Sequence, residues 1–328
     1  MNFADPIDIT AVIGAVKKHK DLMVAIDAGE ARDILQHFTP IPGVKDSIEL
    51  GKTSLMSVSR KYTGEFKGQV ESGKIVPRRL IVRPCVMEMA DEPERYRRTY
   101  ITEVKGGLDA NKHPFEIWII NYGLKSASKD LHDVMLTAQY SEEESKTALS
   151  DSFDGIFTIL MNEKAKGNIS TSKKNMFSTG VMTRANVGDK LLEMWRHMPT
   201  TFRKHGGKMY ISEDLGDMYD DWLDDQGTLV TGSDAETAGK KYLRNTNKKC
   251  ELVRLCGMPE GSQCVLLTIK ENIFYGYDKD SDFTSMLPFP SGNPYKFTAA
   301  GKYLLGFEFA YIGHELLCIN DQPVTPAA

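Results

Sequence analysis

The stretch from Asn186 to Gly227, NVGDKLLEMWRHMPTTFRKHGGKMYISEDLGDMYDDWLDDQG, carries the strongest structural signals in the chain. Asn186 is a preferred helix cap, and Pro199 ends the helix that it would begin. Five apolar residues between them fall on one helical face: Val187, Leu191, Met194, Trp195 and Met198. The first part of the stretch therefore predicts a helix with one buried face.

A basic, flexible turn follows over residues 203–207, and then a short strand in which Met209 and Ile211 alternate with Lys208 and Tyr210. Ser212 caps a second helix, which Gly227 ends. Its apolar stripe is Leu215, Met218, Tyr219, Trp222 and Leu223. The stretch thus predicts helix, turn, strand and helix, without a catalytic group that stands out.

The second predicted helix is strongly acidic, with Glu213, Asp214, Asp217, Asp220, Asp221, Asp224 and Asp225. Paired carboxylates can serve acid–base catalysis, but these lie opposite the apolar stripe. A solvated charged face is the better interpretation. A second possible use is docking onto a basic surface of another subunit.

Residues 45–90 have a different character, with glycines scattered among β-formers and charges. We predict a long two-stranded hairpin with little core of its own. Because an isolated hairpin is marginal in water, it needs a partner surface from its own domain or from a neighbour. From Lys52 to Lys105 there are 12 basic residues against 7 acidic ones, a local charge of +5.

Other segments complete an α+β pattern rather than a regular alternation of βαβ units. Helical spacing is visible over residues 7–38, 112–138 and 152–167, and the second of these would form the longest helix. A polar loop is expected over residues 227–241. From residue 251 onward the chain favours strands, over residues 252–256, 264–269, 303–312 and 316–319.

Composition limits the function. The chain has 328 residues, 26% of them charged, and a net charge of -4, which argues against a dedicated nucleic-acid binder. Five cysteines without C-x-x-C spacing make a disulfide framework or a zinc knuckle an unfavourable interpretation. We expect them to be small buried hydrophobes in a reducing environment. No apolar run is long enough to span a bilayer.

Several motifs were weighed for chemistry. Leu50-Gly51-Lys52-Thr53-Ser54 matches the end of a phosphate-binding loop, but the glycine required earlier is Asp46, so a turn in the hairpin is favoured. The alternate acids from Asp278 to Asp282 lack the glycine and the closing glutamate of a calcium loop, which leaves an acidic turn or a weak ion site. None of the histidines forms a metal or nucleophile pattern, although an active site assembled in space stays an alternative. We expect no enzyme, cofactor or metal.

Several phrases resemble the major capsid proteins of tailed bacteriophages, the Hong Kong 97 fold family. Residues 93–99, PERYRRT, precede the predicted long helix and are similar to the entry to the family's spine, and 152–156, SFDGI, are similar to the start of its axial domain. Residues 186–227 are similar to the paired helices of that domain. Residues 264–268, CVLLT, and 271–278, ENIFYGYD, are similar to the return from it, and 302–312 to closing strands.

The resemblance implies an α+β capsid fold with five segments. They are an N-terminal arm with a helix over residues 1–44, an extended β-hairpin loop over 45–90, a peripheral domain with the spine helix over 91–150, an axial domain over 151–270, and return strands of the peripheral domain over 271–328. No segment resembles a fused scaffolding domain, and the lysine and asparagine that cross-link some members have no match. We therefore expect separate scaffolding and no covalent cross-linking.

The function that the resemblance implies is structural. The chain would assemble into hexamers and pentamers of an icosahedral head that encloses double-stranded DNA without reading its sequence, with portal, scaffolding and decoration proteins as partners and no membrane. It would assemble in the host cytoplasm and reside in the virion. An encapsulin-type compartment shell and a soluble α+β enzyme are the alternatives.

Ion pairing between the basic hairpin and the acidic helix of a neighbouring subunit would explain both charge clusters, and two unrelated solvated patches would explain them equally well. The basic residues alternate with acids and lack interleaved aromatics, which speaks against nucleic acid as their partner. The candidate interface residues are Lys52, Arg60, Lys61, Lys67, Arg78, Arg79, Arg83, Asp217, Asp220, Asp221 and Asp224.

Overall fold

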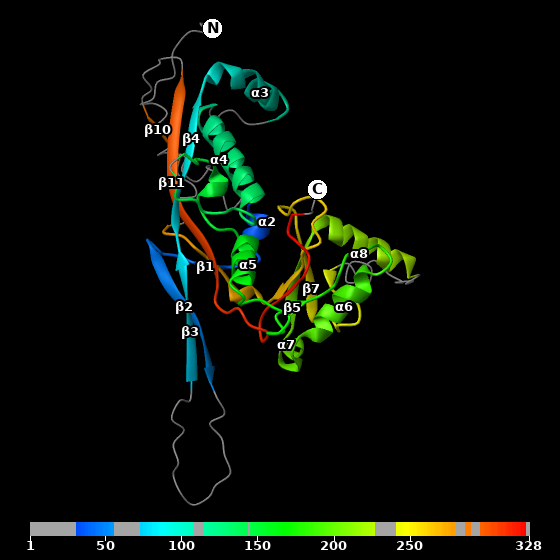
Figure 1. Ribbon diagram of the computed structural model, residues 1–328. Helices are drawn as coiled ribbons and strands as arrows, with labels where there is room; N and C mark the ends of the chain where they lie inside the picture. Colours follow the sequence, from blue (N-terminus) through cyan, green and yellow to red (C-terminus); the bar gives the residue numbers. More distant parts are fainter. Residues whose placement is uncertain are drawn as a thin grey trace, which may run out of the picture. The chain divides into compact units, whose positions relative to one another are not determined.

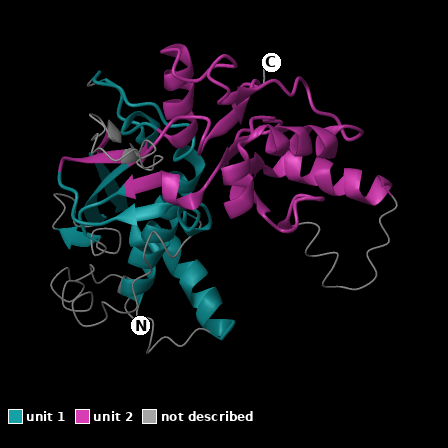
Figure 2. Ribbon diagram, turned by 90° about the horizontal axis from the view of Figure 1, so that it is seen from below, with its two compact units in different colours: residues 1–45, 82–154, 276–306 teal, residues 46–81, 155–275, 307–328 magenta. Residues whose placement is uncertain are grey.

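The computed structural model describes residues 31–55, 73–107, 115–143, 145–226, 241–279, 286–289 and 296–325. It divides into two compact units (Figure 2): the first has residues 1–45, 82–154 and 276–306, and the second has residues 46–81, 155–275 and 307–328. Residues 7–30 of the helix predicted over 7–38, the hairpin tip, residues 227–240 of the loop predicted over 227–241, and the acids Asp280 and Asp282 lie outside the described residues.

The first unit is built on antiparallel strands. β11 (Phe297–Phe309) pairs with β4 (Arg83–Asp91) on one side and with β10 (Leu287–Phe289) on the other. Cys85, Met87, Tyr303 and Leu305 are buried on one face of these strands. Strand alternation therefore leaves the other face, with Val86 and Leu287, exposed. The chain also passes through β1 (Thr39–Ile41) and, at the boundary between the units, through β9 (Ile273–Gly276).

The predicted long helix is present as α4 (Phe115–Val134), with Ile117, Ile120, Leu124 and Leu131 fully buried. Its 20 residues span about 30 Å, which is shorter than the 27-residue prediction implied. Gly123 brings α4 close to Met89 of β4, so the helix packs against the buried side of the strands (Figure 1). Two short helical pieces, α2 (Arg32–Leu35) and η3 (Leu149–Asp151), complete this unit's regular structure among the described residues.

A second helix of this unit, α3 (Pro93–Lys105), was not predicted from the sequence. Pro93 at its first turn is its sole buried residue, so it lacks the apolar stripe that reveals most helices. An aromatic ladder joins it to α4: the Tyr100 and Trp118 rings lie 5.6 Å apart, and Trp118 continues to Tyr122 at 5.7 Å. The Trp118 indole N–H also donates to Glu103 of α3 at 2.7 Å.

The second unit contains the stretch from Asn186 to Gly227. The predicted helices are present as α6 (Val187–His197) and α8 (Glu213–Asp225) around the strand β6 (Gly207–Ser212). Ser212 caps α8 as expected, since its Oγ accepts from the Leu215 N–H. Asn186 does not cap α6: its Oδ1 accepts from the Thr183 N–H at 2.8 Å, before the helix.

Two details of this stretch differ from the prediction. Residues 200–205 form a short helix, α7 (Thr200–His205), instead of a flexible turn, and Gly206 ends it with a left-handed φ of 96°. A side chain at Gly206 would meet the Lys249 carbonyl oxygen at 2.9 Å. Tyr210 is fully buried instead of alternating with the core, because β6 has a strand on each side and both of its faces are covered.

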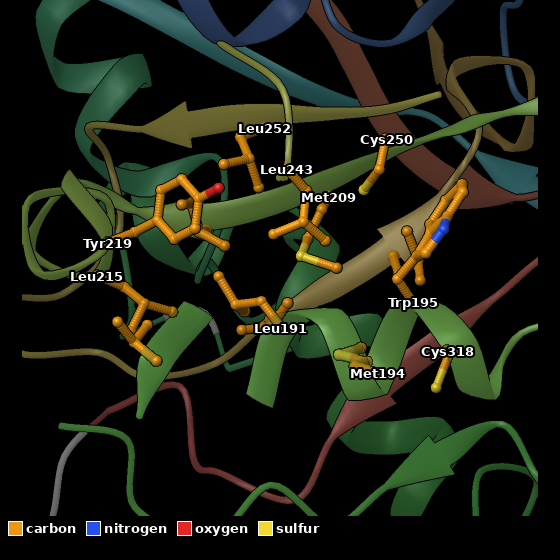
Figure 3. Packing of buried hydrophobic residues seen from close by; sticks show 14 of the residues in the cluster. Leu191, Met194, Trp195, Met209, Leu215, Tyr219, Leu243, Cys250, Leu252 and Cys318 are labelled. Carbon is orange, nitrogen blue, oxygen red and sulfur yellow. The ribbon is translucent and has the colours of Figure 1, made fainter. Parts of the chain in front are cut away.

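The sheet of this unit has the order β5-β12-β8-β6-β7, with β5 (Met176–Phe177), β12 (Cys318–Asn320), β8 (Leu266–Thr268) and β7 (Cys250–Leu255) around β6. Figure 3 shows its core, where Leu191 and Trp195 of α6 meet Leu215 and Tyr219 of α8 and Met209 of β6. β6 and β7 run parallel, and β8 is antiparallel to β6.

The rest of the second unit includes α5 (Ile156–Ala165), η4 (Lys270–Asn272) and the hairpin. α5 begins at Ile156, four residues later than predicted, and buries Phe157 and Leu160. In the hairpin, β2 (Ser47–Leu55) is antiparallel to β3 (Gly73–Ile81), and the two strands form a sheet of their own (Figure 1). Residues 50–54 are thus part of a strand, and the expectation of a turn there was wrong. The two-stranded pairing ends at Ile81, because β4 pairs with β11 instead.

Candidate inter-subunit surfaces

The hairpin presents one open face along its described length. The register pairs Glu49 with Arg79 and Gly51 with Pro77, and side chains of cross-strand partners point to the same face. These four residues and Ile81 are all exposed. The other face carries Leu50 and Leu80, which are buried, so one side of the hairpin packs on its own chain and the other is exposed in the described part of the structure.

Arg78 points to the covered side of the hairpin. Its guanidinium donates to Glu308 Oε1 from Nη2 at 2.7 Å and from Nε at 3.2 Å, and its Nη1 lies 3.5 Å from Glu163 Oε2. Burial raises the pKa of Glu308 more than Arg78 lowers it. Burial also disfavours the charged form of Glu163, but hydrogen bonds from Asn168 and Arg78 outweigh burial, and the pKa of Glu163 is lowered. Arg78 therefore anchors the hairpin to α5 and to the end of β11.

The neighbouring Arg79 lies on the open face and is 63% exposed, against 17% for Arg78. It donates to Ser47 Oγ at 2.7 Å and lies 3.6 Å from Asp46. Arg60, Lys61 and Lys67 fall outside the described residues, and the structure describes Lys52 by its backbone in β2 alone. Among the hairpin candidates with described side chains, Arg79 is the one that an external partner can reach.

Arg83 belongs to the first unit, at the start of β4. Its guanidinium lies over the Tyr140 ring, 3.8 Å from the ring centroid, and its side chain is half-buried. A cation held over an aromatic face is already satisfied in part. The structure therefore separates Arg83 from the hairpin, with which the sequence grouped it.

An apolar surface that the sequence analysis missed lies on the open face of β4, β11 and β10. Val86 and Leu287 are each 58% exposed and Phe289 is 47% exposed. The register places Leu287 beside Ala300, and Phe289 beside Thr298, on that face. The signal was the alternation of Val86 with Cys85 and Met87. This alternation identifies an exposed face only once β10, which is distant in sequence, is known to lie in the same sheet as β4.

The acidic helix α8 is partly neutralised inside its own unit. Arg254 of β7 donates to Asp220 Oδ2 at 2.5 Å and to Asp217 Oδ1 at 3.0 Å. Gly216 leaves room for this side chain, because a Cβ there would lie 2.7 Å from Arg254 Nε. Asp220 is accordingly half-buried, whereas Asp217 stays exposed.

A second arginine meets the far end of α8. Arg184 donates from Nε to Asp225 Oδ2 at 2.8 Å, and its Nη1 lies 3.4 Å from Asp221. Hydrogen bonding to Arg184 lowers the pKa of Asp225. Asp221 and Asp224 remain exposed. The candidates on α8 thus form one surface, of which Asp217, Asp221 and Asp224 are open to a partner.

The described residues offer little for catalysis. Burial raises the pKa of the Cys85, Cys264 and Cys318 thiols to about 12 and also that of Cys250, so these four are poor nucleophiles; Cys256 is the exposed one. Three or more potential metal ligands do not gather anywhere in the described ranges. Within the same ranges, the helices are too short or too polar to cross a bilayer.

Comparison with known proteins finds similar structures but no similar sequence. No family model and no curated protein matches the chain. Among solved structures, one chain from the procapsid of satellite phage P4, a structure that includes the size determination (Sid) protein, is similar over 97% of this chain and 91% of its own. The TM-score is 0.57 and the identity 12%.

A chain from the capsid of an empty GTA particle is similar over 88% of this chain and 89% of its own, with a TM-score of 0.56 and 8% identity. The match to the capsid of the native GTA particle has a TM-score of 0.53. These similarities extend over nearly the full length of each partner and include both units. The chain therefore has the α+β capsid fold of the Hong Kong 97 type.

Proposed function

We propose that this chain is the major capsid protein of a tailed bacteriophage and assembles into an icosahedral shell. The observation that carries the proposal is the near-complete, two-way coverage of the similarity to the phage P4 procapsid chain. A fold can host many functions, so the surfaces have to carry the rest of the argument.

Two of those surfaces support a protein that functions only among copies of itself. The hairpin forms a two-stranded sheet whose open face is exposed along its described length. Three large apolar side chains, Val86, Leu287 and Phe289, are exposed on the outer face of β4 and β10, among them the charged Glu88 and Lys302. A neighbouring copy would cover both, and many moderate contacts repeated by symmetry would add up to a stable particle.

In this proposal the five segments keep the roles that the resemblance implies. The arm is residues 1–44, the hairpin loop is 45–81 because β4 belongs to the sheet of the first unit, the peripheral domain is 82–150 with 271–328, and the axial domain 151–270 packs around the centre of hexamers and pentamers. The particle encloses double-stranded DNA without sequence-specific contacts, as a net charge of -4 suits. Portal, scaffolding and decoration proteins are its partners in the host cytoplasm and the virion.

Electron microscopy and sedimentation of the purified full-length chain, with and without a scaffolding protein encoded beside it, test the proposal. We expect closed particles of uniform diameter or capsomer-sized rings. A protein that stays monomeric under every condition would contradict a shell function. Particles recovered from cells with protein cargo, and no nuclease-protected DNA, would instead identify a compartment shell.

A further inference from the structure

Charge is segregated within the second unit. Residues 213–226 contain seven acidic residues and no basic one. Residues 199–210 and 241–251 together contain seven basic residues against the single acid Glu251. We call the exposed acids of α8 the acidic surface (Glu213, Asp214, Asp217, Asp221, Asp224 and Asp225). We call Lys204, His205, Lys248 and Lys249, which are all exposed, the basic surface.

The basic surface is held together by hydrogen bonds. Lys249 Nζ donates to the Lys204 carbonyl oxygen at 3.0 Å, and the Gly207 N–H donates to the Lys249 carbonyl oxygen at 2.9 Å. The turn before Lys249 has left-handed backbone at Asn247 and Lys248, with φ values of 52° and 58°. The end of α7 and this turn therefore present their cations side by side.

The two surfaces lie on different sides of the unit. The parallel pair β6–β7 begins at Gly207 and Cys250, beside the basic surface, and ends at Ser212 and Leu255, where α8 starts. Six strand residues span about 20 Å. Figure 1 likewise shows α7 and α8 well apart within this unit. The first turn of α8, with Glu213 and Asp214, thus lies beyond a Debye length of about 10 Å from the basic surface.

Internal ion pairs neutralise the acidic surface only in part. Arg254 and Arg184 are the two cations paired with α8 in the described structure, against its seven acids. On the basic side, Glu251 pairs with Lys208 and Lys241, which are not among the three lysines of that surface. Each surface keeps a clear excess of one sign.

We infer that the acidic surface of one copy docks onto the basic surface of a second copy, head to tail. The inference rests on the proposed function in one respect, namely that copies of this chain meet. A contact between two identical surfaces, acidic on acidic or basic on basic, would oppose like charges, which is unfavourable. A head-to-tail contact repeats around a ring. The acidic helix thereby receives a partner other than the hairpin that the sequence suggested.

Reciprocal charge reversal tests the inference. One variant carries Asp221→Lys and Asp224→Lys, the other carries Lys204→Glu and Lys248→Glu, and a third carries all four changes. Matched controls reverse exposed charges elsewhere in the unit, Glu260→Lys and Lys173→Glu. Circular dichroism and thermal unfolding establish that each variant is folded. Subunit association is measured by sedimentation and native mass spectrometry between 50 mM and 500 mM salt.

Each two-residue variant should associate at least tenfold more weakly with itself than the parent does at low salt. The equimolar mixture of both and the fourfold variant should recover association. Because the two variants must alternate, their mixture should give rings with an even number of subunits. Unchanged self-association of folded variants, or a mixture that fails to recover it, would overturn the inference.

The failure of this inference is distinguishable from that of the proposed function. If the parent associates through both charged surfaces but builds no shell, the proposed shell function is contradicted and the head-to-tail contact is supported. If the parent and both reversal variants form shells equally well, the shell function is supported and the head-to-tail contact is contradicted.

Discussion

Gly188 lies at a close helix–helix contact in the second unit. It lies in α6 and faces Trp222 of α8, and a Cβ built on it would lie inside the van der Waals envelope of the indole ring. The two helices approach so closely at this point because glycine has no side chain there. Nothing in the sequence marks Gly188 as critical, since its neighbour across the contact is 34 residues away.

Replacing Gly188 by alanine should lower the free energy of unfolding by about 1–3 kcal/mol through overpacking. This holds although alanine gains roughly 1 kcal/mol over glycine inside a helix. The matched control is Gly123→Ala in α4, where the nearest atoms are the flexible thioether sulfurs of Met89 and Met286 at 3.2 and 3.3 Å. Chemical denaturation of both variants checks the prediction, and equal stabilities would contradict it.

Asp321 gives the second unit a defined dependence on acid. Burial disfavours its carboxylate, but hydrogen bonds from Ser178, Gln322 and Thr179 outweigh burial and lower its pKa to about 2. Because the folded pKa lies below the unfolded one, the stabilisation is complete above about pH 4 and is lost as the pH falls towards 2.

Asp321→Asn should therefore cost on the order of 1 kcal/mol at pH 7, after a discount for solvent screening. It should also flatten the loss of stability between pH 4 and pH 2. Thermal unfolding across that range, for parent and variant, measures both effects. Parallel curves for the two proteins would show that the carboxylate is not held as described.

At the scale of elements, the half-buried Arg78 ties the hairpin to its unit through its ion pairs with Glu163 and Glu308. Removing one partner of a buried ion pair leaves an uncompensated charge, so Arg78→Met should lower the free energy of unfolding by about 3 kcal/mol. Arg79→Met, one residue along the same strand, should change it by less than about 0.5 kcal/mol, because Arg79 is mostly exposed.

Adding Glu308→Met to Arg78→Met should recover part of the loss, since it removes the stranded carboxylate that accepts two of the arginine's hydrogen bonds. Urea denaturation of the three proteins provides the measurement. An Arg78 variant as stable as its Arg79 counterpart would mean that the hairpin is not anchored there.

Elements with a clear apolar stripe could be predicted from the sequence, and those without one could not. α4, α6 and α8 followed from helical spacing, and Ser212 was identified as a cap from its residue type and position. α3 could not be predicted because Pro93 is its one buried residue, so the helix shows no apolar stripe in the sequence. The boundary between β3 and β4 could not be predicted, because both segments favour strands. The chain changes its pairing there, from β3 with β2 to β4 with β11, and this pairing is decided by tertiary structure.

The same reason explains how far the candidate surfaces could be predicted. The sequence showed which residues are charged, but it could not show that Arg78 faces inward while Arg79 faces outward, since that depends on the strand register. It could not show that Arg254 and Arg184 engage α8 from 34 or more positions away. The apolar face of β4, β11 and β10 needed three distant segments in one sheet.

For the whole molecule, we expect that the hairpin is needed for particle assembly and not for folding of the subunit. Replacing residues 53–75 by Asn-Gly, between the paired Lys52 and Val76, keeps the anchored base of the hairpin and supplies a two-residue turn. The shortened chain should stay folded, with a melting temperature close to the parent's, and should no longer form particles. Sedimentation against the parent measures this, and particles of normal size would contradict an inter-subunit role for the hairpin.

The central claim is that neighbouring copies cover what this chain leaves open. A cryo-electron microscopy reconstruction of its assembled particles, at a resolution that traces β2 and β3, tests that claim most directly. We predict that, in the assembled particle, the open face of the hairpin with Glu49, Arg79 and Ile81 lies against another subunit. The same face found packed on its own subunit, or left in solvent within a complete shell, would contradict it.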